Sequence, residues 1–242
     1  MSEPLRRNRV DALDAAHENK FSAQFPKINK PQFIAINVGP NSVQGEPPAA
    51  TSFEVYQSNG QLARKLTAEE SVVSVTEYAY ERWDDFKGIA FYQLQQMMEV
   101  MQVPLSGVAA LTLQYVDIFT NKCNREEYKI HELVPEGCPY IPADFAARGP
   151  FWHLHQGWFE ILDNDRLLNR IHIDAAENPV PGYFVKYDHI LKLDVIPPNG
   201  STKVSWDQIY DAYEKLHIKN KEVLKKFLVD DMQERIRLKN VC

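Results

Sequence analysis

Histidine and aspartate residues recur at two-residue spacing in the second half of the chain. His153 and His155 lie in the segment 151–162, whose aromatic and branched residues are typical of a β-strand. Because side chains alternate between the two faces of a strand, both imidazoles are expected on one face. His172 and Asp174 show the same spacing on the next predicted strand, 168–175.

Two or three imidazoles with a carboxylate form a suitable ligand set for zinc or another divalent metal. The sequence therefore predicts a candidate metal site at His153, His155, His172 and Asp174, and a metal-dependent hydrolase or nuclease is one functional hypothesis. The alternative is a polar sheet surface that binds nothing, on which Arg170 pairs with Asp174.

Other catalytic signatures are missing from the sequence. It contains no Gly-x-Ser-x-Gly elbow, no glycine-rich phosphate loop and no paired Cys-x-x-Cys motif. We therefore expect a non-enzymatic binding protein that acts through a protein partner or a bound ligand, without a cofactor unless the divalent metal is one. Self-association into a homo-oligomer is also expected.

Composition indicates a cytoplasmic protein. Three widely spaced cysteines suit a reducing compartment better than a disulfide framework. No targeting segment is expected at the start of the chain, and no apolar run is long enough to cross a membrane. The net charge of −6 gives the whole molecule no general attraction to nucleic acid or anionic lipid.

An echo between the two halves predicts the architecture. Trp83-Asp84 opens one long helical pattern, 82–101, and Trp206-Asp207 opens another, 205–238, with a bend expected near Asn220. Strand patterns precede both helices. They cover 33–38, 52–56, 62–66, 71–78, 108–119, 151–162, 168–175 and 183–195. The sequence therefore predicts an α+β fold with antiparallel sheet packed against two long helices, as an internal duplication of a strand-rich unit plus helix.

Four segments follow from this pattern. Residues 1–30 are expected to form an N-terminal arm or helix, and 31–120 a first strand-rich unit with its helix. Residues 121–150, rich in proline and glycine, are expected to connect the halves. Residues 151–242 form the predicted second unit.

Two further sets of residues suggest binding surfaces. A surplus of aromatic residues suggests a partner-binding surface at Trp152, Trp158, Tyr183 and Tyr187. The locally basic closing helix suggests a phosphate-binding face at Lys219, Lys221, Lys225 and Lys226, which makes nucleic-acid binding a further hypothesis. A solvated helix surface is the alternative for these lysines.

Three places in the chain carry a resemblance to a known family. They are Tyr80 to Phe86, Leu111 to Asp117, and Leu216-His217 with Phe227. The chain resembles a sporadically distributed family of bacterial and archaeal proteins of about this length, which has no established activity. Gln114 and Asp117 stand where that family has arginine and asparagine. The patchy distribution implies an association with mobile defence or toxin–antitoxin loci.

Overall fold

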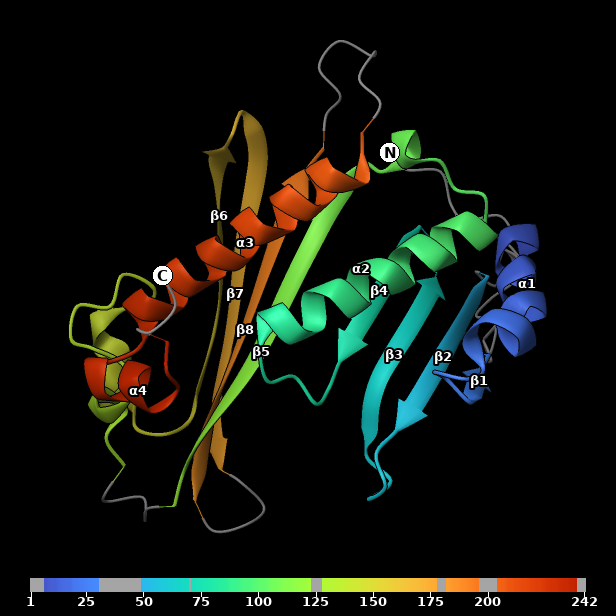
Figure 1. The fold of residues 1–242 in the computed structure, drawn as a ribbon. Helices are drawn as coiled ribbons and strands as arrows, with labels where there is room; N and C mark the ends of the chain where they lie inside the picture. The colour runs from blue at the N-terminus through green and yellow to red at the C-terminus, as the bar shows by residue number, and fades with distance from the viewer. Residues whose placement is uncertain are drawn as a thin grey trace, which may run out of the picture. The chain divides into compact units, whose positions relative to one another are not determined.

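The computed structural model divides into two compact units, Met1–Val108 and Ala109–Cys242. Each unit contains a four-stranded antiparallel sheet and one long helix, which confirms the predicted α+β class (Figure 1). The described residues are 7–30, 49–69, 71–122, 128–177, 182–195 and 204–238. The strand predicted at 33–38 lies outside them.

The first unit is a sheet of order β1-β2-β3-β4 with α2 following the last strand. Asn59-Gly60, a pair that favours tight hairpin turns, connects β2 to β3, with Gly60 at φ 82°. The elements of this unit are α1 (Arg7–Ala16), a π-helical turn (His17–Phe21), β1 (Lys27–Asn29), β2 (Ala50–Tyr56), β3 (Leu62–Glu69), β4 (Val72–Glu77), α2 (Trp83–Val100) and a 3-10 turn (Leu105–Gly107).

The core of the first unit joins the N-terminal segment to the sheet and to the end of α2. Leu13 from α1, Phe53 from β2 and Leu66 from β3 are fully buried together with Met97 of α2 and Met101, the residue that follows this helix. The predicted arm is thus an integral part of this unit, because its apolar residues complete the core.

The second unit is a sheet of order β5-β8-β7-β6 covered on one face by α3 (Figure 1). Ser205 and Gln208 form a capping box at the start of α3. This helix ends at Phe227, so the break lies seven residues later than expected from Asn220. The elements are β5 (Ala110–Asn121), 3-10 turns (Ile130–Glu132 and Ala143–Arg148), β6 (Trp152–Leu162), β7 (Asp165–Glu177), β8 (Tyr183–Asp194), α3 (Trp206–Phe227) and α4 (Asp230–Arg235).

Two predicted boundaries differ from the structure. The sequence pattern predicts that 108–119 belongs to the first unit. In the structure, β5 pairs with β8 along all twelve of its residues and belongs to the second unit. The predicted connector 121–150 is also part of that unit. Its Ile130, Leu133 and Val134 are buried in the same core as Phe227, because its 3-10 turns carry apolar side chains inward.

The echo between the halves extends to a three-stranded meander and the helix that follows it. β2-β3-β4 leads to α2 and β6-β7-β8 leads to α3, and Trp83 and Trp206 are the first residues of these helices. The fourth strands break the equivalence, since β1 lies beside the first strand of its meander and β5 beside the last. Trp83 is buried and Trp206 half-buried. Among the described residues, no helix is long and apolar enough to cross a membrane.

Candidate metal site on the outer face of the second sheet

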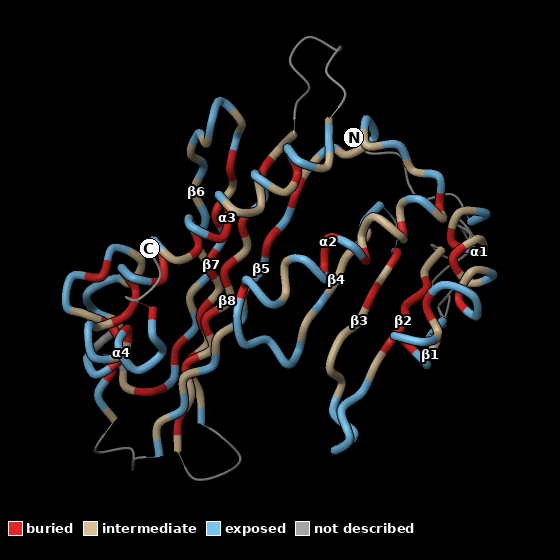
Figure 2. The backbone as a smooth tube through the Cα atoms, viewed as in Figure 1, coloured by how far each residue is buried: buried red, intermediate tan, exposed pale blue. Residues whose placement is uncertain are grey.

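The sheet of the second unit separates its residues into two faces. Along β7 and β8, buried positions alternate with more exposed ones, as Figure 2 shows for the backbone. The covered face, turned toward α3, carries Ile171, Ile173 and Tyr187 among its fully buried residues. The opposite face, here called the outer face, carries His153, His155, His172, Asp174 and Asp188, all exposed or half-buried.

A tight turn fixes the register that brings the histidines together. Asp163 and Asn164 connect β6 to β7, and both have positive φ, 50° and 77°. Two such residues suit the turn that matches the twist of a hairpin. The resulting register places His153 opposite Asp174 and His155 opposite His172. The short Asp-Asn loop thus determines which side chains meet ten residues away.

Three of the four predicted ligands converge. His153 Nδ1 lies 2.8 Å from Asp174 Oδ1, and His172 Nε2 lies 3.2 Å from that same oxygen and 3.2 Å from His153 Nδ1. In a tetrahedral zinc site with bonds of 2.0–2.1 Å, ligand atoms stand about 3.3 Å apart. Two of the three distances match this spacing to about 0.1 Å, and the third, between His153 Nδ1 and Asp174 Oδ1, is about 0.5 Å shorter.

The electrostatics of the cluster favour the ligand form of the carboxylate. Partial burial raises the pKa of Asp174, but the hydrogen bond from His153 and the neighbouring imidazoles lower it further, so the pKa lies below its ordinary value. The side chains of His172 and Asp174 are 32% and 35% exposed and that of His153 is 62% exposed, so a solvated ion can reach all three.

His155 does not join the converging atoms. Its ring stacks on that of His172, with centroids 5.2 Å apart and planes at 26°. His155 lies on the same face as His153, as expected from their two-residue spacing. It pairs with His172, however, whereas His153 pairs with Asp174. Beyond His172 in the same row lies Asp188, which accepts a hydrogen bond from Gln114 Nε2 at 2.8 Å. His155 is thus a neighbour of the site and can restrict the rotation of His172.

The aromatic residues predicted to bind a partner lie on the covered face. Trp152, Tyr183 and Tyr187 are buried, and Trp158 is half-buried and stacked on Tyr140 with centroids 5.3 Å apart. The prediction of a surface formed by these four residues is wrong, because their strand positions point toward α3 and the turns before β6. They build the core of the second unit.

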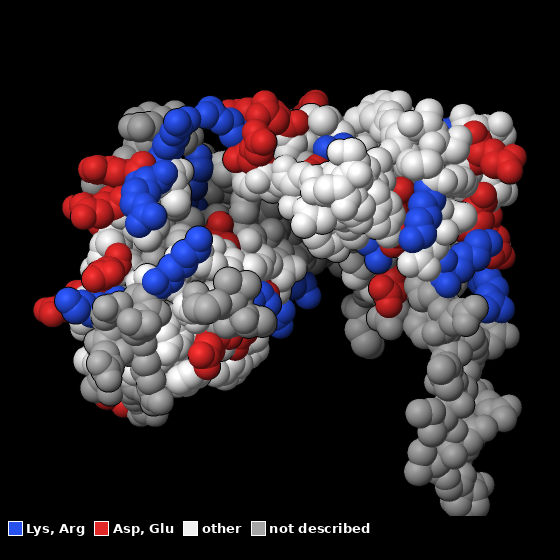
Figure 3. Space-filling model, turned by 90° about the horizontal axis from the view of Figure 1, so that it is seen from below, with Lys and Arg blue, Asp and Glu red and all other residues white. Residues whose placement is uncertain are grey.

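The basic residues of α3 do not form one continuous face. At 100° per residue, Lys219 and Lys226 lie on one flank of the helix and Lys221 and Lys225 on the other. Lys219 Nζ is also ion-paired with Glu160 at 2.8 Å. In the view of Figure 3, basic and acidic side chains are interspersed. A uniformly basic patch is therefore not formed by these four positions.

A buried polar network on the covered face was missed by the sequence reasoning. His189 is fully buried, and its Nδ1 lies 2.8 Å from Asn220 Oδ1 of α3. Its Nε2 lies 3.3 Å from Asn169 Oδ1, and Asn169 donates to Glu160. Polar residues at positions 169, 189 and 220, inside otherwise apolar stripes, were the available signal. This network links three strands to α3. Lys219 forms its outer end, because Lys219 is ion-paired with Glu160.

Three comparisons with known proteins gave no match. A scan against family models, a search of curated proteins and a search of solved structures all found nothing similar to this chain.

Proposed function

We propose that this chain is a binding protein that takes up a divalent metal ion, with zinc as the best fit, on the outer face of its second unit. The observation that carries the proposal is the convergence of His153 Nδ1, His172 Nε2 and Asp174 Oδ1 from two adjacent strands. Two imidazoles and a carboxylate suit zinc in both ligand type and spacing.

The position of the cluster on two paired strands supports this proposal. Sheet residues hold their Cα positions through the ladder of backbone hydrogen bonds, so only side-chain torsions need to adjust when an ion enters. Asp174 is charged at neutral pH, as an ordinary aspartate is, and the neighbouring imidazoles lower its pKa further. The ligand that most strongly attracts the cation is therefore ready before binding.

The test is a calorimetric titration of zinc chloride into protein purified without a histidine tag. We expect one ion per chain. Asp174→Asn and His172→Ala should each weaken binding by more than about 100-fold, beyond the effect of losing an outer-shell partner. His155→Ala is the matched control, since it removes an imidazole from the same face without removing a converging atom. Equal losses in all three variants would contradict the proposed ligand set.

A metal-dependent hydrolase is the second candidate. Three protein ligands leave a coordination position for water, as catalytic zinc sites do, and a bound water can then act as a nucleophile. Asp188 lies next to His172 in the sheet and is the nearest carboxylate in its row. Zinc-dependent hydrolysis of bis-p-nitrophenyl phosphate that is lost in Asp188→Asn, with zinc binding retained, would favour this candidate over simple binding.

Self-association or a protein partner remains part of the proposal. Both edges of the outer face carry exposed apolar side chains: Val116 and Ile118 on β5, and Phe159 and Ile161 on β6. Exposed apolar groups at sheet edges favour contact with another chain. Light scattering with and without zinc measures the oligomeric state, and a monomer under both conditions would remove self-association.

A further inference from the structure

Two basic side chains flank the metal cluster on the outer face of the second sheet. Arg170 lies two residues before His172 on β7, and Lys186 of β8 lies directly opposite Asp174. Arg170 is exposed and Lys186 half-buried. Within the described residues, neither side chain forms a hydrogen bond or an ion pair, and the carboxylate of Asp174 bonds to the imidazoles instead. Both cationic groups are therefore available to a ligand that reaches the cluster from solvent.

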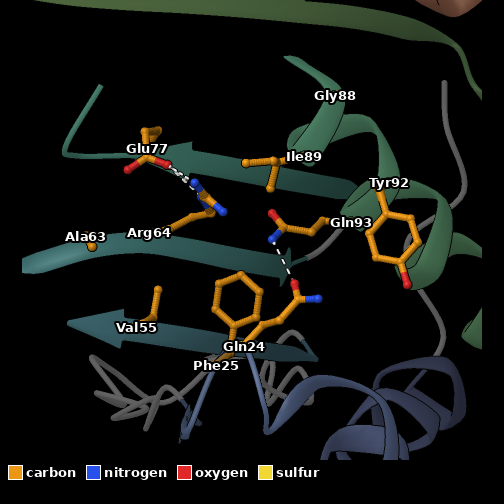
Figure 4. Close-up of a pocket in the computed structure, with 10 residues that line it drawn as sticks. All are labelled: Gln24, Phe25, Val55, Ala63, Arg64, Glu77, Gly88, Ile89, Tyr92 and Gln93. Atoms are coloured by element: carbon orange, nitrogen blue, oxygen red, sulfur yellow. Dashed lines mark hydrogen bonds and ion pairs between the residues drawn. The ribbon is translucent and has the colours of Figure 1, made fainter. Parts of the chain in front are cut away.

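The neighbouring strands offer Arg170 no acceptor side chain. It stands between Gly157 of β6 and Ile190 of β8, and neither residue has a polar side-chain atom. In the first unit, by contrast, Arg64 of β3 is directly opposite Glu77 of β4, and its Nε donates to Glu77 Oε2 at 2.6 Å (Figure 4). An arginine on a sheet is thus paired where its cross-strand neighbour is acidic, and Arg170 lacks such a neighbour.

Two unpaired cations beside a metal site are unfavourable for the metal alone, because like charges repel. In charge, Asp174 and Asp188 offset Arg170 and Lys186, which lie on the same two strands. With the imidazoles neutral, a divalent ion at the cluster therefore leaves its own two positive charges uncompensated. A ligand with two negative charges would neutralise the site, and it would also give Arg170 and Lys186 the partner that they lack.

We propose that the metal site binds a phosphate dianion, either inorganic phosphate or the terminal phosphate of a monoester. This inference rests on the proposed metal site and names its ligand. One phosphate oxygen occupies the coordination position that three protein ligands leave open, and the other oxygens accept from Arg170 and Lys186. A phosphate group carries up to about two negative charges at neutral pH, which matches the charge that the ion leaves.

The spacing of the sheet brings both cationic groups within reach of such a ligand. Successive residues on one face of a strand are about 7 Å apart, which separates the Cα atoms of Arg170 and His172. Residues directly opposite on antiparallel strands have Cα atoms about 5 Å apart, as for Lys186 and Asp174. Arginine and lysine side chains are long enough to span these separations, so both head groups can meet above the cluster.

The test is a titration of phenyl phosphate and phenyl sulfate into the full-length protein, with and without one equivalent of zinc, followed by NMR of the backbone amides. The two ligands have the same shape, but phenyl phosphate carries two charges and phenyl sulfate one. With zinc, we expect phenyl phosphate to bind with a dissociation constant below about 1 mM and phenyl sulfate at least about tenfold more weakly. Equal binding of the two ligands, or binding of phenyl phosphate that does not depend on zinc, would overturn the inference.

Variants locate the phosphate. Arg170→Met and Lys186→Met each remove one charge and keep an unbranched side chain, and each should weaken phenyl phosphate about tenfold without weakening zinc. Lys192→Met is the matched control, because Lys192 is an exposed lysine on the same face of β8. It lies about 20 Å along the strand from Lys186. At physiological salt this exceeds the screening length of about 8 Å, so binding should not change. Equal losses in all three variants would refute the assignment to Arg170 and Lys186.

A zinc titration of the same samples separates this inference from the one on which it rests. Zinc binding without binding of phenyl phosphate would overturn the phosphate inference alone, whereas absence of zinc binding would overturn both. Competition with inorganic phosphate identifies the source of the dianion. Displacement of phenyl phosphate by a lower concentration of inorganic phosphate indicates the free anion, and displacement only by a higher concentration indicates an ester.

Discussion

The two faces of the sheet in the second unit hold histidines in opposite environments. On the covered face His189 is fully buried and contacts the amides of Asn169 and Asn220. On the outer face His153 and His172 are accessible to solvent and converge on one carboxylate oxygen. His189 of β8 is thus part of the folded core, whereas His172 of the neighbouring strand β7 is a candidate metal ligand.

What separates the two cases is burial of the imidazole in one and its exposure to solvent in the other. Burial lowers the pKa of His189 to about 4, although the hydrogen bond with Asn220 acts in the opposite direction. This residue is neutral at physiological pH and enclosed by protein. The outer-face imidazoles have exposed surface and one shared oxygen between them, so they can accept an additional partner.

The largest expected effect is on the covered face. Phe227→Ala removes a fully buried ring whose centroid lies 4.6 Å from that of Tyr187, and should lower the free energy of unfolding by about 3–5 kcal/mol. Phe159→Ala is the matched change on the outer face, where the ring is 64% exposed and lies beneath Arg166. It should cost less than about 1 kcal/mol. Denaturant unfolding measures both, and similar losses would mean that the outer face is covered in solution.

The buried histidine should give the protein a dependence of stability on pH. Its pKa is about 6.5 when unfolded and about 4 when folded, so between these values the unfolded chain binds a proton that the folded one does not. Stability is therefore lost as pH falls from about 6.5 to about 4, by up to about 3 kcal/mol at this site. Unfolding curves across this range measure the slope.

His189→Gln serves as the control for this slope. Glutamine keeps an amide between Asn169 and Asn220 but does not titrate, so its curve should be flatter than that of the unsubstituted protein over the same range. Parallel curves would show that His189 does not account for the pH dependence.

Asp117 should act with the opposite sign and a smaller effect. It lies on the covered face of β5, opposite Tyr187, and burial raises its pKa to about 6. A raised carboxyl pKa contributes stability that is present below about 4 and lost as pH rises through about 6. Asp117→Asn should therefore stabilise the fold at pH 7 by about 1–2 kcal/mol, a figure reduced for its partial exposure. A destabilised variant at pH 7 would contradict this assignment.

The sequence predicted the strands of the second unit and the residues that share a face, because alternation is a local property. The Asp163-Asn164 turn is local in the same way, and it is sufficient to align His153 with Asp174. Alternation does not reveal which face a helix covers. Trp152 and Tyr187 were therefore interpreted as surface residues, although α3 and the turns before β6 bury them.

Long-range pairing was equally beyond local patterns. β5 resembles any other strand in its sequence, and its place beside β8 depends on contacts about seventy residues apart, such as Gln114 with Asp188.

The smallest expected effect belongs to the outer face without metal. His153→Ala removes a side chain that is 62% exposed, so the free energy of unfolding in the presence of a chelator should change by no more than about 0.5 kcal/mol. With zinc at about one hundred times its dissociation constant, the unsubstituted protein should gain about 2.7 kcal/mol, and His153→Ala should gain far less because one converging atom is gone. His155→Ala should keep the zinc-dependent gain.

Thermal or denaturant unfolding with chelator and with zinc measures all three proteins. A large loss in His153→Ala with chelator alone would make this imidazole part of the fold, like His189, and would end the distinction between the two faces.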